Sequence, residues 1–252
     1  MNDFHGKPGV AIVTGGTGGL GAAICRTLAG RGCEIAFTYR SDREAAERLA
    51  AELGGAVADQ LDLTDPARSK AYVDSVTERF GAIHTLVHAA GPLVPQQHLS
   101  TVDPADFGRH LAAEAAAFFN LVQPALPALR ASKGSIVAVT TAATKRYPVR
   151  DGLSAGPKGA VEATARALAA EEGRFGVRVN CVGPGMLTDG MATDLMASGD
   201  LDERALDAAR RAIPLRTFGS AQDIAEAVCF LASDRAGFIS GQKLDVDGGY
   251  GV

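Results

Sequence analysis

The chain has 252 residues, 46% of them hydrophobic, and a formal net charge of −4. This length fits one large α/β domain, and the modest, scattered charge excludes the basic stripe of a nucleic-acid-binding protein. No apolar run approaches the ~20 residues of a membrane span, and the first residues carry no apolar signal region. We therefore expect a single domain over residues 1–252, located in the cytoplasm, with neither a nucleic-acid nor a membrane partner.

The first apolar run of the chain leads into a glycine-rich turn. Val10–Val13 predicts a short buried strand, and Leu20, Ile24 and Leu28 recur at the spacing of one helix face. The turn between them contains Gly15, Gly16, Gly18, Gly19 and Gly21. A backbone without side chains lets a diphosphate reach its amides, and the start of the following helix attracts an anion. Strand, turn and helix together predict a dinucleotide site with a G-x-G-x-x-G match.

Strands and helices alternate along the rest of the chain. The further strands that we expect are Ile35–Tyr39, Ala56–Leu61, Ile83–Ala89, Ser135–Thr140, Val177–Val182 and Leu244–Val246. One expected helix runs from a capping box at Ser41 and Glu44 to Leu53, and the next runs from Asp65-Pro66 to Phe80-Gly81. A long helix is expected from Asp103-Pro104 towards Leu129, with a disturbance near Pro124 and Pro127. Two more are expected around Lys158–Glu171 and over Ala221–Leu231, the latter with Ser220 and Asp223 at its start. This alternation predicts a Rossmann-type, doubly wound parallel sheet of about seven strands with helices on both faces.

Two further features of the sequence lead to predictions, namely the segment Leu187–Ile213 and the four cysteines. Leu187–Ile213 is less regular and predicts a helical substrate flap, in which Met186, Leu187, Met191 and Leu195 offer apolar contacts or simply pack in the core. The cysteines show neither metal-ligand spacing nor the density of a disulfide framework, and no metal is expected. Three of them lie in apolar surroundings and are expected to be small core residues, namely Cys25, Cys181 and Cys229.

Six ordered motifs carry a resemblance to a known family. They are Thr14-Gly15-x-x-x-Gly19-x-Gly21, Asp62 in Asp-Leu-Thr, His88-Ala89-Ala90-Gly91, Arg178–Gly185 with Thr188, Phe230–Asp234, and Ile239–Gly241 through Val246–Gly249. With these motifs the chain resembles the short-chain dehydrogenase/reductase family nearly end to end, and most of all its 3-oxoacyl-carrier-protein reductase branch. The resemblance implies a nicotinamide cofactor and a small or acyl-type substrate. It also implies a homotetramer or homodimer in which the two long helices pack on their symmetry mates.

The resemblance also assigns the cofactor contacts. The implied residues are Gly15, Thr17, Gly19, Leu20, Gly21, Arg40, Ser41, Asp62, Leu63, His88, Ala89, Ala90, Gly91, Lys158, Pro184, Gly185 and Thr188. No acid stands directly at the end of the second strand to hold a ribose 2′-hydroxyl, whereas Arg40 and Ser41 suit a 2′-phosphate. Asp42 weakens this argument, and Arg40 as an ordinary surface charge is the alternative. The sequence favours NADP(H) over NAD(H).

The catalytic stretch departs from the family pattern. The family uses Asn, Ser and Y-x-x-x-K, and the resemblance leaves only Lys158 unchanged. Ser154 stands at the tyrosine position, Thr141 at or next to the serine position, and Glu114 at the asparagine position. A serine hydroxyl is a far weaker acid than a phenol of pKa ~10, so Lys158 cannot make it a comparable proton donor. General acid–base help is worth about 10²–10⁴ in rate, and the usual proton step is therefore not expected.

Other groups are alternative proton donors. Tyr147, seven residues before Ser154, either swings towards the gap or packs on the surface. His88 either shuttles a proton or fills the hydrogen bonds of the missing asparagine. His98 lies in a predicted mouth loop, and Glu114 either pairs with Lys158 or has no contact with the site. Because Pro157 belongs in a first helical turn, we expect the helix to begin near Ala155 or Gly156, with Ser154 in a loop.

Three functions are compatible with these observations. The favoured one is an atypical NADPH-dependent carbonyl reductase. The second is a catalytically silent subunit that still binds the dinucleotide, paired with an active homologue. The third is a non-redox lyase or isomerase with Lys158, Glu114 or His88 as its base.

Overall fold

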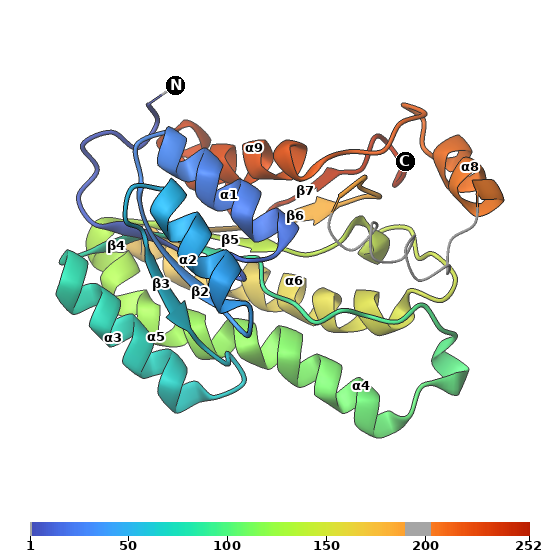
Figure 1. The fold of residues 1–252 in the computed structure, drawn as a ribbon, viewed down its shortest axis with the longest axis horizontal. Helices are drawn as coiled ribbons and strands as arrows, with labels where there is room; N and C mark the ends of the chain where they lie inside the picture. Colours follow the sequence, from blue (N-terminus) through green and yellow to red (C-terminus); the bar gives the residue numbers. More distant parts are fainter. Residues whose placement is uncertain (1, 190–202) are drawn as a thin grey trace.

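The computed structural model describes residues 2–189 and 203–252, and within them seven parallel strands form one sheet (Figure 1). The strands are β1 (Val10–Thr14), β2 (Glu34–Tyr39), β3 (Val57–Gln60), β4 (Ile83–His88), β5 (Ser135–Val139), β6 (Arg178–Pro184) and β7 (Lys243–Val246). Their spatial order is β3-β2-β1-β4-β5-β6-β7, and every pairing is parallel. The order reverses between β1 and β4, which places a ligand crevice at the carboxyl ends of these two strands.

Helices cover both faces of this sheet (Figure 1). The helices are α1 (Gly19–Gly30), α2 (Arg43–Glu52), α3 (Pro66–Phe80), α4 (Pro104–Leu111), α5 (Ala117–Ser132), α6 (Gly152–Glu172), α8 (Glu203–Ala212) and α9 (Ala221–Ala232). One core lies between the sheet and α1, α2 and α9, and the other between the sheet and α3, α5 and α6. The predicted doubly wound α/β fold is confirmed.

The strand residues alternate between the two cores. Ala11 and Val13 of β1 pack towards α1 and α9, whereas Val10 and Ile12 pack towards α3 and α5. All four side chains are fully buried. A continuous apolar run is the pattern expected of a strand that is covered on both faces.

Side-chain caps set several helix boundaries. Asp65 accepts hydrogen bonds from the amides of Ala67 and Arg68 at the start of α3, and Ser220 forms a capping box with Asp223 before α9. The predicted capping box at Ser41 is wrong. Asp42 is the N-cap of α2 instead and accepts from the amide of Ala45 at 2.9 Å.

The long helix after Asp103 is interrupted, but not at its prolines. Pro124 and Pro127 lie within α5, and the irregularity is a π-helical turn at Ala112–Ala116 between α4 and α5. Pro127 is exposed and Pro124 is half-buried. On the solvent side of a helix, water can hydrate a carbonyl group that a proline leaves without its amide donor, which lowers the penalty for the proline.

Helix α6 begins earlier than expected. Regular helix runs from Gly152, so the prediction that Ser154 lies in a loop is wrong. The amides of Ser154 and Ala155 both donate to the carbonyl oxygen of Asp151, at 3.1 and 2.9 Å. Pro157 breaks only one bond near the helix start, and burial of its ring and of Leu153 offsets that loss.

Part of the expected flap lies outside the described residues. This part includes Met191 and Leu195. Of the rest, Leu187 is buried in the core beside α9 and pairs with Gly219, so it packs inside rather than facing a substrate. Helix α8 confirms helical structure near the end of the segment.

Candidate functional site

A cleft of about 300 Å³ opens at the carboxyl ends of β1, β2 and β4. Its lining residues are Gly15, Thr17, Gly18, Thr38, Tyr39, Arg40, Ser41, Leu61, Asp62, Leu63, Thr64, Ala89, Ala90, Gly91, Pro92, Ala113 and Ala117. The cleft therefore brings together the glycine turn, the end of β2, the Asp-Leu-Thr stretch and the segment after β4. These are the four regions that the sequence assigns to a dinucleotide.

The glycine turn at the base of the cleft has no room for a side chain at Gly15, Gly16 or Gly21. Gly15 has φ +69°, and its carbonyl oxygen accepts from the amide of Gly18 at 3.0 Å. A Cβ atom on Gly21 would lie 2.1 Å from this same oxygen. Gly18, the N-cap of α1, supplies no side-chain cap, so the first amides of α1 are free to bind a diphosphate.

The end of β2 presents a basic rather than an acidic surface to the cleft. Arg40 and Ser41 line it and are exposed. The carboxylate of Asp42 is occupied as the cap of α2. The objection that Asp42 raises against NADP(H) is therefore weaker than the sequence alone indicates.

Asp62 has a fixed carboxylate at the far side of the cleft. Its Oδ1 accepts from the hydroxyl of Thr64 at 2.7 Å and from the amide of Thr64 at 2.9 Å. These hydrogen bonds lower the pKa of Asp62 below its usual range. The group is therefore an ionised acceptor at neutral pH.

His88 joins the ends of β1 and β4 beneath the cleft. Thr14 Oγ1 accepts from the amides of Ala89 and Ala90, both at 3.0 Å, so its own proton faces His88 Nδ1 at 3.3 Å. Nε2 then carries the ring proton, and this buried atom has no partner among the described residues. Burial, and then the charge of Lys158, lower the pKa of His88 to about 3. A ring that stays neutral at physiological pH favours the structural interpretation over a proton shuttle.

The depressed pKa of His88 predicts a pH-dependent stability. Its folded-state value of about 3 lies below the ordinary ~6.5, so the contribution is complete above pH ~6.5 and is lost as the pH falls towards 3. One such proton changes the unfolding free energy by up to ~1.4 kcal/mol per pH unit. We expect His88→Asn to lose less stability than the parent between pH 6.5 and 4 in urea unfolding. If the unfolding free energies of the two proteins fell equally with pH over this range, the prediction would be contradicted.

Lys158 and Glu114 form a buried ion pair beside the cleft. Nζ of Lys158 lies 3.0 Å from Oε1 and 3.1 Å from Oε2 of Glu114, and the two side chains are 15% and 3% exposed. A Cβ on Gly91 would lie 2.7 Å from Oε1 and 3.5 Å from Nζ, so the pair packs against the cleft wall. Glu114 lies on the π-helical turn and Lys158 lies on α6. Of the two interpretations of Glu114, the structure therefore favours the ion pair with Lys158.

The other candidate catalytic groups are placed differently. Ser154 lies one turn before Lys158 on α6 and is partly buried. Thr141 Oγ1 accepts from the amide of Ala143 at 3.1 Å, which leaves its proton free to donate, whereas Thr140 is buried against β6. Tyr147 is 70% exposed, as its surface interpretation requires, and His98 is also exposed.

Several predicted cofactor residues do not line the cleft. Gly19, Leu20 and Gly21 form the first turn of α1, directly after the lining residue Gly18, and His88 is buried. Gly185 packs on Asp247, and Thr188 donates to the carbonyl oxygen of Gly219. Pro184 ends β6 beside Val246.

Other residues of the cleft wall were not predicted from the sequence. They are Thr38, Tyr39, Leu61, Thr64, Pro92, Ala113 and Ala117. Thr38, Tyr39 and Leu61 adjoin predicted residues at strand ends. Ala113 and Ala117 carry no signal of their own, because the π-helical turn brings them to the cleft.

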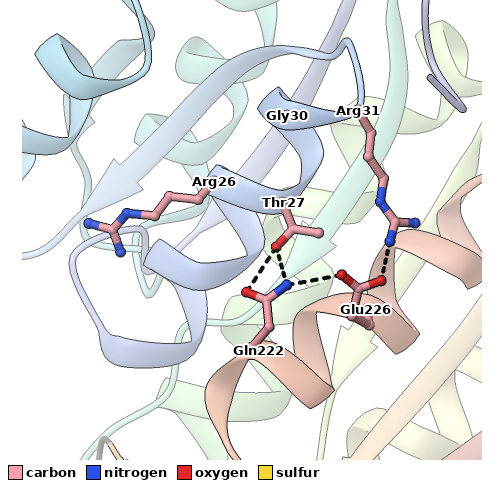
Figure 2. A pocket seen from close by; sticks show the side chains of 6 residues that line it. All are labelled: Arg26, Thr27, Gly30, Arg31, Gln222 and Glu226. Carbon is pink, nitrogen blue, oxygen red and sulfur yellow. Dashed lines mark hydrogen bonds and ion pairs between the residues drawn. The ribbon is translucent and has the colours of Figure 1, made fainter. Parts of the chain in front are cut away.

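A second hollow, of about 440 Å³, lies between α1 and α9 (Figure 2). Gln222 donates to Thr27 at 3.2 Å and to Glu226 at 3.0 Å. Arg31 is bound by Glu226, and Arg26 is bound by Glu52 at 2.7 Å. The Gln222–Thr27 and Arg31–Glu226 contacts join the two helices, and the charged side chains that line the hollow all have partners, which leaves none to hold a ligand.

Among the described residues there is neither a side-chain cluster that could bind a metal nor a helix that could cross a membrane. Over residues 2–189 and 203–252, no three His, Cys, Asp or Glu side chains gather as a metal site would require. All four cysteines are buried and unpaired, as expected of core residues. In the same residues no helix combines the length and the apolar character that crossing a bilayer demands.

Parallel strands around a glycine turn, with the strand order reversed at the cleft, define a Rossmann-type dinucleotide-binding protein. Comparison with known proteins supports this classification. A family model described as enoyl-(acyl carrier protein) reductase matches residues 15–251. L-fucose dehydrogenase of Oryctolagus cuniculus is 32% identical over 246 residues, 98% of this chain and 85% of that protein. The chain belongs to the short-chain dehydrogenase/reductase family.

Two further relatives illustrate the range of this family. The 3-oxoacyl-(acyl-carrier-protein) reductase of Staphylococcus aureus is 33% identical, over 95% of this chain and 96% of that protein. A blue fluorescent protein from a metagenomic library, solved in complex with NADPH, superimposes with a TM-score of 0.89 at 32% identity. That match covers 99% of this chain and 100% of the other.

Proposed function

We propose that this protein is an NADP(H)-dependent oxidoreductase that reduces a carbonyl group, or oxidises an alcohol, of a small or acyl-type substrate. The observation that carries the proposal is the Lys158–Glu114 ion pair, which holds the lysine against Gly91 in the wall of the cleft. A protein that no longer used this lysine would gain nothing from burying a charge to hold it. The names of the relatives, two of them enzymes of carbonyl or alcohol chemistry, support the same reaction class.

Each part of the chain has a role in this proposal. The free amides at the start of α1 bind the diphosphate, Arg40 and Ser41 bind the 2′-phosphate, and Asp62 accepts from the adenine. Lys158 holds the nicotinamide ribose, and the hydroxyl of Thr141 donates to the substrate oxygen. The bound nicotinamide supplies or accepts the hydride. The fit rests on the glycine turn that a side chain would fill and on the uncapped amides of α1.

Coenzyme choice tests the 2′-phosphate site. We expect Arg40→Ala to raise the dissociation constant for NADPH about 10-fold or more and to leave that for NADH unchanged, because a charge-assisted hydrogen bond contributes ~1.5–3 kcal/mol. Fluorescence titration measures both constants. Arg43→Ala is the matched control, since that guanidinium is exposed and bound to Glu47 instead. Equal weakening of both coenzymes by Arg40→Ala would refute the role.

Ser154 favours a second candidate, a silent subunit that binds the coenzyme without turnover. Following NADPH absorbance with a panel of ketones separates the two candidates. We expect slow oxidation of NADPH by the parent and faster oxidation by Ser154→Tyr, with a gain of up to about 10²–10⁴ if the phenol reaches Lys158. Activity in the variant alone would establish the silent subunit.

We also propose that the protein assembles as a homotetramer or homodimer through α5 and α6. Phe119 of α5 is 47% exposed, and burial against a second copy would remove this apolar surface from water. Light scattering of the purified protein measures the mass. A monomer at micromolar concentration would refute the assembly.

A further inference from the structure

Asp151 precedes the first residue of α6, and its side chain does not cap the helix. Its backbone carbonyl accepts from the amides of Ser154 and Ala155, but its carboxylate makes no bond to the first turn. Oδ1 accepts instead from the side-chain amide of Gln96 at 3.0 Å. The carboxylate therefore faces the loop that leaves the cleft after Gly91, where a capping role does not explain it.

That loop is fastened to the start of α6 at several points. The amide of Gln97 donates to the carbonyl oxygen of Arg150 at 3.0 Å, and the guanidinium of Arg150 donates to the carbonyl oxygen of Gln96. The side chain of Leu99 fills the space beside Gly152, where an added Cβ would lie 2.6 Å from Leu99 Cδ1. These contacts fasten the loop to the residues on either side of Asp151.

Asp151 shares one face of α6 with two residues of the candidate site. The positions of Asp151, Ser154 and Lys158 follow the i, i+3, i+7 spacing of a helix stripe. Lys158 ends the stripe in its ion pair with Glu114, and Ser154, where the family has its tyrosine, lies between. The Asp151 carboxyl stands at the open end of this stripe, one helical turn before the position at which the family carries its phenol.

The charge balance around Asp151 suits a proton donor. The groups that act on the Asp151 carboxyl are Gln96 from the loop and Lys158, which is paired with Glu114, whereas the guanidinium of neighbouring Arg150 donates to the carbonyl oxygen of Gln96. Burial raises the pKa of Asp151 above its ordinary range, although Gln96 and Lys158 both act to lower it. The carboxyl therefore keeps its proton to a higher pH than an exposed aspartate does.

We propose that Asp151 is the catalytic acid and base of this protein, in place of the missing tyrosine. The inference rests on the proposed oxidoreductase function. In reduction, the dihydronicotinamide coenzyme gives a hydride to the carbonyl carbon, and the O–H bond of the Asp151 carboxyl breaks as its proton passes to the carbonyl oxygen. The ketone is reduced to an alcohol, the coenzyme is oxidised, and Asp151 is left as a carboxylate that regains a proton from water. Oxidation of an alcohol runs through the same steps in reverse.

Kinetics with the full chain and NADPH provide the first test. We expect kcat/KM for ketone reduction to fall as the pH rises through the pKa of Asp151. Asp151→Asn should lose this pH dependence and about 10²-fold or more in rate, whereas Asp151→Glu should restore part of both. The matched control is Asp103→Asn, because that aspartate does cap its helix, accepting from the amide of Ala105 at 2.7 Å, and asparagine caps equally well. Unchanged rate and pH profile in Asp151→Asn would overturn the inference.

Carboxyl-carbon NMR of the coenzyme-free protein gives a second, independent measurement. The resonance lost in Asp151→Asn is expected to titrate above the ~3.9 of an exposed aspartate. In the double variant Lys158→Met, Glu114→Gln it should titrate higher still, because the nearby positive charge is gone. If the pKa of Asp151 were that of an exposed aspartate and did not change in the double variant, the inference would be overturned. The proposed function would still stand. No turnover by the parent with any ketone, despite NADPH binding, would overturn both.

Discussion

Replacing Lys158 by methionine is expected to destabilise the protein by about 3–5 kcal/mol, because the substitution leaves Glu114 buried without its counter-ion. The Glu114 side chain is only 3% exposed, so water cannot take the place of the ammonium group. Urea unfolding at pH 7 measures the difference. Lys70→Met is the matched control, since Lys70 pairs with Asp74 at 2.6 Å but both side chains are well exposed, and a change of about 0.5 kcal/mol or less is expected there.

The double variant Lys158→Met, Glu114→Gln separates charge from packing. Removing both charges should recover most of the lost stability, because neither side chain then carries an unpaired charge. It should not recover turnover, since the ribose contact that we propose for Lys158 remains lost. A single Lys158→Met variant as stable as Lys70→Met would show that Glu114 does not depend on this ion pair.

Substituting alanine for Gly21 is expected to raise the dissociation constant for NADPH about 100-fold or more, equivalent to ~2.7 kcal/mol. The new Cβ would meet the carbonyl oxygen of Gly15 at 2.1 Å, so the turn that we propose to bind the diphosphate must move. Fluorescence titration measures the affinity, and circular dichroism shows whether the fold persists. Gly30→Ala is the control on the same helix, because its Cβ would meet nothing within 4 Å. A folded Gly21→Ala variant with the parental affinity would contradict the diphosphate site.

The fold was predictable because its signals are local. The apolar run of β1, the glycine turn and the apolar face of α1 each depend on residues close together in the chain. The same is true of the caps at Asp65 and at Ser220. The wrong boundaries arise where neighbouring residues compete. Ser41 and Asp42 are both good caps, and only the path of the chain leaving β2 selects Asp42.

The cleft was predictable in outline for a related reason. Parallel strands end at one edge of the sheet, so motifs that follow β1, β2 and β4 must converge there. Ala113 on the π-helical turn and Ala117 at the start of α5 were not predictable, because alanine has no functional group by which a sequence pattern could reveal its position.

The amino-acid sequence by itself determined the order of strands and helices and the glycine turn, because these follow from residue types and their spacing. Only the tertiary structure decided that Glu114 meets Lys158 across 44 residues of chain, that His88 is sealed from water, and that Asp151 turns from its own helix towards Gln96. The physical reason is that the energy of an ion pair or a hydrogen bond depends on how deeply the groups are buried and on partners from distant segments. Packing, rather than sequence spacing, sets both.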